Sequence, residues 1–173
     1  ATEGSLKALL NLYPDRKCKV YLMHGDLSAG QMTSLYTHPK VKAIINIAHG
    51  EGFGLPLFEA AREGLPVITI GWSGQLDFLH HDGKNYFQKV DYTIGPVQPE
   101  AVWDGVIEED SMWAFADQGS YKMTLRDTRK NIRKAKTTAN KLKSIIQDKF
   151  SDEKLYAEFC EQINSAINAK EEK

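Results

Sequence analysis

The chain has 173 residues, of which 42% are hydrophobic and 26% charged. These proportions are those of ordinary globular domains, so they exclude a chain that is disordered throughout. No apolar stretch reaches the roughly 20 residues that cross a bilayer, and the first residues lack the layout of a secretory signal. Cys18 and Cys160 form no C-x-x-C pair, which disfavours a disulfide scaffold and a zinc site. We expect a cytoplasmic protein with no membrane span, whose two thiols are buried on apolar faces.

The net charge of -1 conceals two segments of opposite sign. Residues 91–117 hold seven acidic residues and neither Lys nor Arg, whereas residues 120–149 hold ten basic residues and two acidic ones. A basic stripe of this kind is one way to bind nucleic acid, but aromatic or glycine-rich recognition elements are missing here. We therefore expect a solvated helix face turned toward the acidic segment and no nucleic-acid partner, with a nucleic-acid-binding domain as a third hypothesis.

The first half of the chain alternates helical patterns with short apolar runs. Apolar spacing predicts a helix over residues 6–13, and Pro14 ends it. Residues 17–23 are a strand candidate, and Ser28 is the predicted N-cap of a helix that ends before His38-Pro39. Residues 41–48 are nearly all apolar and rich in β-branched side chains, which predicts a central strand buried on both faces of a parallel sheet.

The second half continues this alternation and then becomes helical. The predicted elements are a helix over residues 55–62 with Pro56 in its first turn, strands over 66–70 and 86–90, an irregular or short-helical stretch over 96–116, one long helix over 121–150, and a last helix capped by residues 151–153. Strands that alternate with helices are typical of βα units and a parallel sheet. We expect an α/β fold with a Rossmann-like region over residues 1–119 and a helical segment over 120–173 packed on it.

The chemically informative stretch runs from the predicted central strand into a helix through three glycines at alternate positions, Gly50, Gly52 and Gly54. Such a turn exposes unpaired backbone amides and the positive end of the helix dipole, which together bind anions. Glu51 and Glu59 bracket this turn, and carboxylates bind hydroxyl groups as acceptors. A ligand with both phosphates and sugar hydroxyls fits the two halves of this pattern.

Two other interpretations compete at this motif. A dinucleotide fingerprint is incomplete, because Leu55 follows Gly54 and the next strand ends without the acid that binds a ribose. The glycines alone would equally suit a tight turn with solvated glutamates. For a glycine triplet taken alone, the tight turn is the simpler interpretation.

The segment Glu51-Gly-Phe-Gly-Leu-Pro-Leu-Phe-Glu59, followed by Gly64-Leu-Pro-Val-Ile68, resembles the E-x7-E region of retaining GT-B glycosyltransferases of the family 4 kind. The resemblance continues through residues 71–79, where Asp77 stands in place of the more common Glu. Upstream, residues 20–28 are similar to the strand and loop that lie beside the nucleobase in this family. The similar region therefore covers about residues 19–79.

The resemblance implies the C-terminal, donor-binding domain of a retaining, hexosyltransferase-like enzyme that binds a nucleotide-diphosphate sugar. By this resemblance, Glu51 is the catalytic residue and contacts the transferred sugar, and Glu59 accepts hydrogen bonds from the ribose. The amides of Gly52, Phe53, Gly54 and Leu55 would hold the sugar and phosphate. His49 beside them either contacts the ligand or has a purely structural role. The family needs no bound metal, and no D-x-D motif occurs here, so we expect neither a metal nor a cofactor.

The resemblance also implies a partner domain. Enzymes of this kind bind the acceptor with a separate N-terminal domain, and their donor domain begins with a strand and loop that carry an Arg and a Lys. Nothing before Leu6 corresponds to that segment, so we expect a fragment, or a chain that pairs with another polypeptide, and no transfer by this chain alone. The alternative function is a non-catalytic module that binds a nucleotide sugar or another phosphate ligand.

Overall fold

The computed structural model describes residues 2–171 and divides into two compact units. The first unit ends at Met32 and the second begins at Thr33, so the boundary expected after residue 119 falls inside the second unit. The first unit contains the expected helix as α1 (Thr2–Asn11). The strand expected over residues 17–23 is wrong: no backbone group of this segment pairs with another described segment, and Val20, Tyr21 and Leu22 are exposed.

Helix α2 (Ala29–Thr37) begins where its sequence predicts and spans the boundary between the units. The Ser28 hydroxyl accepts a hydrogen bond from the amide of Gln31 at 3.3 Å, and the Gln31 side chain accepts one from the amide of Ser28 at 2.8 Å. This reciprocal pair is a capping box, which satisfies two amide donors at the start of a helix.

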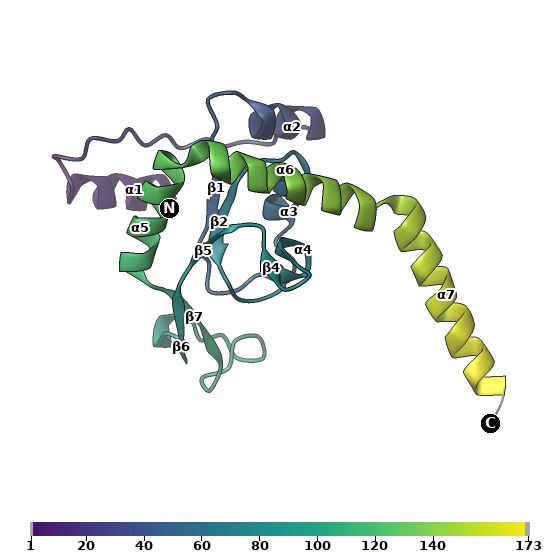
Figure 1. Ribbon diagram of the computed structural model, residues 1–173. Coiled ribbons are helices and arrows are strands. Elements are labelled where there is room, and N and C mark those ends of the chain that lie inside the picture. The colour runs from purple at the N-terminus through teal and green to yellow at the C-terminus, as the bar shows by residue number, and fades with distance from the viewer. Residues whose placement is uncertain (1, 172–173) are drawn as a thin grey trace. The chain divides into compact units, whose positions relative to one another are not determined.

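The second unit is built on a small parallel sheet of β1 (Ile44–Asn46), β2 (Val67–Ile70) and β5 (Gln88–Val90), in the order β1-β2-β5 (Figure 1). All four residues of β2 are buried, so β2 is the central strand. The expectation that residues 41–48 form the central strand is therefore wrong. Strand β1 lies at the edge, because none of the described residues pairs with its far side, and Ile45 is consequently 43% exposed.

Helix α3 (Leu55–Arg62) connects β1 to β2 and has the bounds that the sequence predicts. Pro56 lies in the first turn, where a missing amide hydrogen costs nothing. Gly64 follows the helix with φ of +72°, a backbone conformation that glycine adopts without steric cost. This β1-α3-β2 unit places the glycine-rich turn at the carboxyl edge of the sheet.

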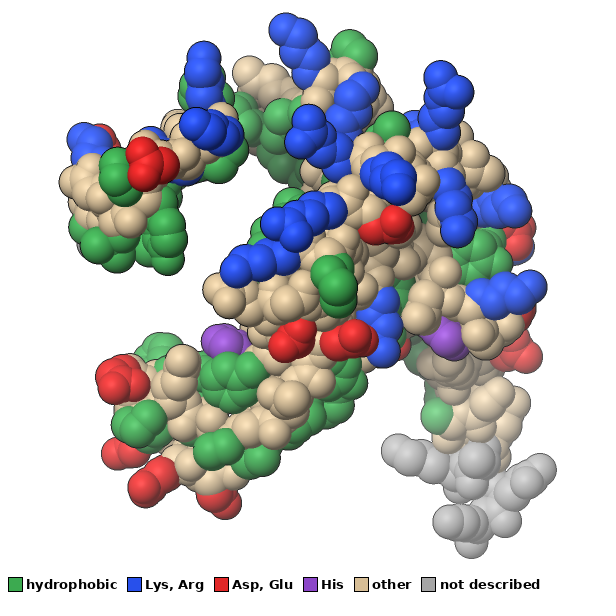
Figure 2. Space-filling view, turned by 60° about the vertical axis from the view of Figure 1, so that its left-hand side comes forward, with side chains coloured by type: hydrophobic (Ala, Val, Ile, Leu, Met, Phe, Trp, Pro, Cys, Tyr) green, Lys and Arg blue, Asp and Glu red, His purple; other side chains and the backbone are tan. Residues whose placement is uncertain are grey.

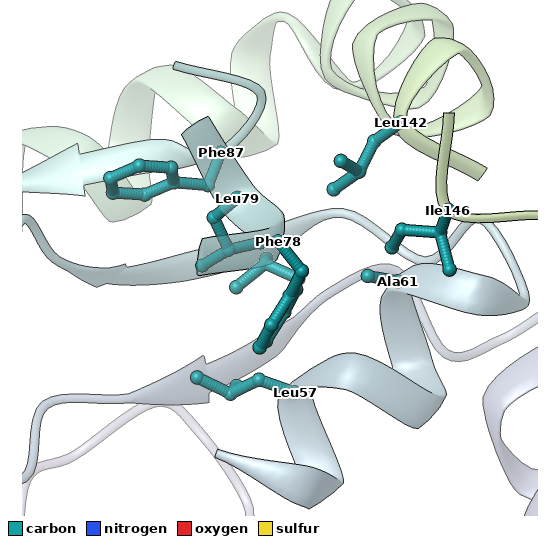
Figure 3. Close-up of a cluster of buried hydrophobic side chains, with 8 residues drawn as sticks. Leu57, Ala61, Phe78, Leu79, Phe87, Leu142 and Ile146 are labelled. Atoms are coloured by element: carbon teal, nitrogen blue, oxygen red, sulfur yellow. The ribbon is translucent and has the colours of Figure 1, made fainter. Parts of the chain in front are cut away.

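A cluster of buried side chains joins α3, the short helix α4 (Leu76–Leu79) and the long helix α6 (Ile132–Lys149). Figure 3 shows these side chains converging; they are Leu57, Ala61, Phe78, Leu79, Phe87, Leu142 and Ile146. A second cluster forms around Ile68, Ile70, Val90 and Ala114. Because alternate residues of a strand point to opposite faces, Val67 joins the first cluster while Ile68 and Ile70 join the second.

The predicted long helix is two helices, α5 (Gln118–Lys130) and α6, separated by Asn131. Asn131 has φ of -108° and ψ of 34°, outside the helical range, and this interrupts the helix. Ala135, Ala139, Leu142 and Ile146 are buried as their spacing predicts. Helix α7 (Asp152–Glu171) follows, and Ser151 accepts a hydrogen bond from the Lys154 amide as its cap.

Two hairpins complete the second unit: β3 (His80–His81) with β4 (Lys84–Asn85), and β6 (Tyr92–Pro96) with β7 (Met112–Ala116). The expectation of irregular or short-helical structure over residues 96–116 is confirmed over 97–111, which hold turns and the short 3-10 helix Pro99–Ala101. It is wrong at Pro96 and over Met112–Ala116, which are strand residues. Gly95 and Pro96 conceal the strand pattern, since both residues are uncommon inside strands.

Within residues 2–171, no ion pair joins the two charged segments to each other. Figure 2 shows acidic side chains on the β6-β7 lobe and Lys and Arg side chains over the helices. Among the described residues, the ion pairs of α6 join Lys143 to Glu63 and Asp148 to Lys154, and none joins α5 or α6 to residues 91–117. The basic face is solvated, as expected, but it is not neutralised by the acidic segment.

Both cysteines are exposed, which contradicts the expectation that they are buried. Cys18 lies in the segment that forms no strand, and Cys160 lies on α7, whose described side chains from Asp152 to Asn168 are exposed to solvent. Within residues 2–171, no helix has both the length and the apolar character that crossing a membrane requires.

Buried His81 makes the stability of this fold sensitive to acid. Its Nε2 donates to the Phe78 carbonyl at 3.0 Å, and its Nδ1 lies 3.5 Å from the Lys149 ammonium, so the neutral ring satisfies both contacts. Burial lowers the pKa of His81 below 6.5, the charge of Lys149 lowers it further, and the bond to Phe78 opposes the change. The unfolded chain therefore takes up a proton before the folded chain does.

We predict that the free energy of unfolding falls as the pH decreases below about 6.5, the ordinary histidine value. His81→Gln removes the titrating ring and should flatten this dependence, whereas His24→Gln, on an exposed histidine, should leave it unchanged. Urea unfolding between pH 7.5 and 5 measures both. Equal pH dependence in wild type and His81→Gln would contradict this account.

Candidate functional site

The glycine-rich turn is held by the loop that follows β2. The amide of Glu51 donates to the Ser73 hydroxyl at 3.0 Å, and that hydroxyl donates to the Glu51 carbonyl at 2.7 Å. The amide of Gly74 donates to the same carbonyl at 3.0 Å. Ser73 adopts φ of +76°, an unfavourable conformation for a residue with a Cβ atom, which the surrounding hydrogen bonds maintain. We call this set of three hydrogen bonds the loop clamp.

Two glycines are required by the close approach of these loops. A Cβ atom on Gly74 would lie 1.8 Å from the Gly52 carbonyl oxygen, which no side chain can occupy. Gly54 has φ of +82°, and a Cβ atom there would lie 3.2 Å from the Cβ of buried Gln75. Gly52 itself has open space where a Cβ would be. Gly54 and Gly74 therefore serve the fold, while Gly52 is not needed for packing.

The turn presents a row of unbonded amides at the start of α3. Within the part of the chain that the structure describes, the amides of Gly52, Phe53, Gly54 and Leu55 donate no hydrogen bond. Phe53 is anchored because its ring packs on Phe58 and Phe78, with centroid distances of 5.2 and 5.1 Å. Free amides at a helix N-terminus form an anion-binding surface.

The Glu51 carboxylate is oriented by Asn46, at the end of β1. Asn46 Nδ2 donates to Glu51 Oε1 at 2.5 Å, while Asn46 Oδ1 accepts from the amide of Ala48 at 2.8 Å. Both groups of the Asn46 side chain are thus engaged, and Glu51 remains half-buried with acceptor positions unused. The carboxylate is held at the edge of the amide row without a cation beside it among the described residues.

Glu59 lies in the second turn of α3 and is half-buried. Its Oε2 accepts a hydrogen bond of 3.3 Å from the hydroxyl of Tyr36, a buried residue of α2 in the second unit. Burial, and then the charge and hydrogen bond of Glu59, raise the pKa of Tyr36 above 10.0, so the hydroxyl keeps its proton at neutral pH. The two glutamates therefore flank the start of α3, each oriented by one neutral donor.

His49 is fixed by the β6-β7 hairpin. Its Nδ1 lies 2.7 Å from the Ala114 carbonyl and must donate to it, and its own carbonyl accepts from the Ala114 amide at 3.1 Å. Its ring stacks on Trp113 with centroids 4.4 Å apart and planes within 9°. The Nδ1 proton leaves Nε2 of a neutral ring as an acceptor.

The structure thus places six of the predicted site residues in one continuous turn, His49 and Glu51 to Leu55, with Glu59 following in α3. Asp77 and Trp72 are exposed and make no hydrogen bond to this turn within the described residues. Sequence reasoning missed Asn46, Ser73 and Tyr36. Asn46 was detectable as the one polar, uncharged residue in an apolar run, whereas Ser73 and Tyr36 approach the turn only through the fold.

His, Cys, Asp and Glu side chains form no group of three suited to a metal ion among residues 2–171. Two cavities, of about 470 and 390 Å³, are lined by residues other than those of the turn. No family model, curated protein or solved structure matches the chain.

Gly54 and Gly52 differ in whether a Cβ atom fits, and this difference tests the packing of the turn directly. Gly54→Ala forces a Cβ into the left-handed region and against Gln75, and should lower the free energy of unfolding by about 1–2 kcal/mol. Gly52→Ala has open space and should change it by less than about 0.5 kcal/mol. Urea unfolding of the two variants compares them, and equal destabilisation would refute the packing that we describe.

Proposed function

We propose that this chain is the donor-binding domain of a retaining glycosyltransferase and binds a nucleotide-diphosphate sugar at residues 51–59. The observation that carries the proposal is the row of four unbonded amides at the start of α3, flanked by Glu51 and Glu59. The sequence resemblance over residues 19–79 is our reason for choosing a nucleotide-diphosphate sugar as the ligand.

The chemistry of the row suits a diphosphate. Backbone amides and the positive end of the α3 dipole favour negative charge, and they need no metal to do so. Glycine at position 52 keeps the approach to the backbone open, since nothing lies within 4 Å of the place of its missing Cβ. In this proposal, the diphosphate lies against the amides of Gly52 to Leu55.

The two carboxylates suit the hydroxyl-bearing ends of the ligand. A carboxylate accepts several hydrogen bonds and cannot donate any when ionised, so it selects hydroxyls rather than phosphate oxygens. Glu59 would accept from the ribose, and Glu51 would accept from the transferred hexose and stabilise it during transfer. His49 Nε2 would be available to the sugar hydroxyls.

Transfer also requires an acceptor. We propose that a separate N-terminal domain binds it and closes over the donor, since groups on both sides of the ligand orient the reaction. In this view, the observed α/β fold with a parallel sheet is the Rossmann-like C-terminal half of a GT-B enzyme.

A non-catalytic module for a nucleotide sugar or another phosphate ligand is the second candidate. The open, half-buried position of Glu51 favours it as well, because a carboxylate that accepts hydroxyls contributes to binding whether or not transfer follows. The two candidates share the site and differ in whether sugar is transferred when an acceptor domain is present.

Separate substitutions of the two glutamates distinguish the roles proposed for them. A hydrogen bond to a charged group contributes about 1.5 to 3 kcal/mol, or roughly ten- to a hundredfold in affinity. Glu59→Ala should weaken binding of the nucleoside diphosphate and of its hexose conjugate by this factor, whereas Glu51→Ala should weaken only the conjugate. Calorimetric titration with uridine, guanosine and adenosine diphosphates and their hexose conjugates measures this.

Glu100→Ala, at an exposed site on the 3-10 helix, is the matched control and should bind like wild type. If Glu59→Ala keeps the wild-type affinity for the nucleoside diphosphate while it remains folded, the ribose role is wrong. If wild type binds none of these ligands, the proposed function itself fails.

A further inference from the structure

Tyr36 lies outside the turn and contacts a proposed ligand-binding group, the Glu59 carboxylate, directly. Tyr36 is only 7% exposed, and its hydroxyl donates to Glu59 Oε2 at 3.3 Å, a contact between α2 and α3 across 23 residues of sequence. Within the described residues, Glu59 has no ion pair and no other side-chain hydrogen bond. The position of this carboxylate therefore depends on Tyr36.

A glutamate needs such a partner in order to present its oxygens in one direction. Its side chain rotates about three bonds, and fixing it costs rotamer entropy unless a contact selects one state. The Tyr36 side chain is buried in the free protein, so its hydroxyl already contacts Glu59 before any ligand arrives. One hydrogen bond to Oε2 leaves Oε1 and the second lone pair of Oε2 as acceptors.

We infer that Tyr36 is a positioning residue that orients Glu59 to accept hydrogen bonds from both hydroxyls of a ribose. This inference rests on the proposed function and deepens it. Two adjacent hydroxyls require acceptors that are held in one place, and the Tyr36 contact restrains the Glu59 carboxylate at Oε2. Tyr36 thereby sets the preference for ribose over deoxyribose, without touching the ligand.

The choice of a tyrosine suits this role. A lysine or arginine at the same place would neutralise Glu59 and compete for its oxygens, whereas a hydroxyl donates one bond and adds no charge. Burial and the charge of Glu59 raise the pKa of Tyr36, so the donor remains protonated throughout the neutral range. Glu59 thus has no neutralising cation beside it among the described residues and keeps most of its acceptor capacity for the ligand.

Tyr36→Phe removes the hydroxyl and keeps the packed ring. We expect affinity for a nucleoside diphosphate to fall about two- to tenfold, the range of one net hydrogen bond of 0.5 to 1.5 kcal/mol. Affinity for the 2′-deoxy and 3′-deoxy analogues should fall less, so the ribose preference shrinks. Calorimetry with uridine, guanosine and adenosine diphosphates and these analogues measures the ratio.

Tyr121→Phe makes the same chemical change at a half-buried tyrosine that has no side-chain hydrogen bond among the described contacts, and should leave the ratio unchanged. A ribose preference that stays at the wild-type value in Tyr36→Phe overturns the inference while the proposed function stands. A wild type that binds no nucleoside diphosphate overturns both.

A second measurement does not depend on the ligand. Side-chain scalar couplings of Glu59 in the free wild-type protein should report one dominant rotamer, and in Tyr36→Phe they should average toward several. Averaged couplings in the wild type, or equal couplings in the two proteins, contradict the positioning role.

Discussion

The loop clamp between the turn after β1 and the loop after β2 is the constraint on which the site depends. Two neighbouring parallel strands end at the same edge, and the hydrogen bonds from Ser73 and Gly74 fix the Glu51 backbone between them. Once the Glu51 carbonyl and amide are engaged, the next four amides have no partner inside the described chain. The four free amides therefore follow directly in sequence from the residue that the loop clamp holds.

The hydrophobic core keeps this clamp in place. Leu57 and Ala61 bury one face of α3 against α4 and α6, so the start of α3 cannot shift without opening that cluster (Figure 3). Phe53 extends the same packing into the turn. The charges of α6 are those of a binding surface. Its contribution to the candidate site, however, is the packing of its apolar side chains against α3.

The sequence correctly predicted the helix ends that depend on residues close to each other in the chain. Helix α3 was predictable to the residue, because Pro56 suits its first turn and Gly64 its end, and Ser28 marks α2 through a capping box. Pairing could not be predicted in the same way. Residues 41–48 have the composition of a central strand, yet strand order depends on which segments hydrogen-bond together, and β1 lies at the edge.

In the candidate site, too, residues close in sequence could be predicted, and residues brought together by the fold could not. The turn and both glutamates were identified from their spacing, because those residues are close in sequence. Tyr36, Ser73 and the β6-β7 hairpin that holds His49 reach the site only through tertiary contacts, so no sequence spacing marks them. An acidic loop separates the two strands of that hairpin. Because of this acidic composition, the sequence did not indicate that the segment contains strands that hold His49.

The central claim is that the amides of Gly52, Phe53, Gly54 and Leu55 receive the diphosphate of a nucleotide. Backbone amide resonances of the ¹⁵N-labelled protein, followed during titration with a nucleoside diphosphate, test it most directly. The account predicts that the largest shift changes fall on these four amides, with much smaller ones on the loop between β6 and β7. Changes centred elsewhere, on the basic face of α5 and α6 above all, would contradict it.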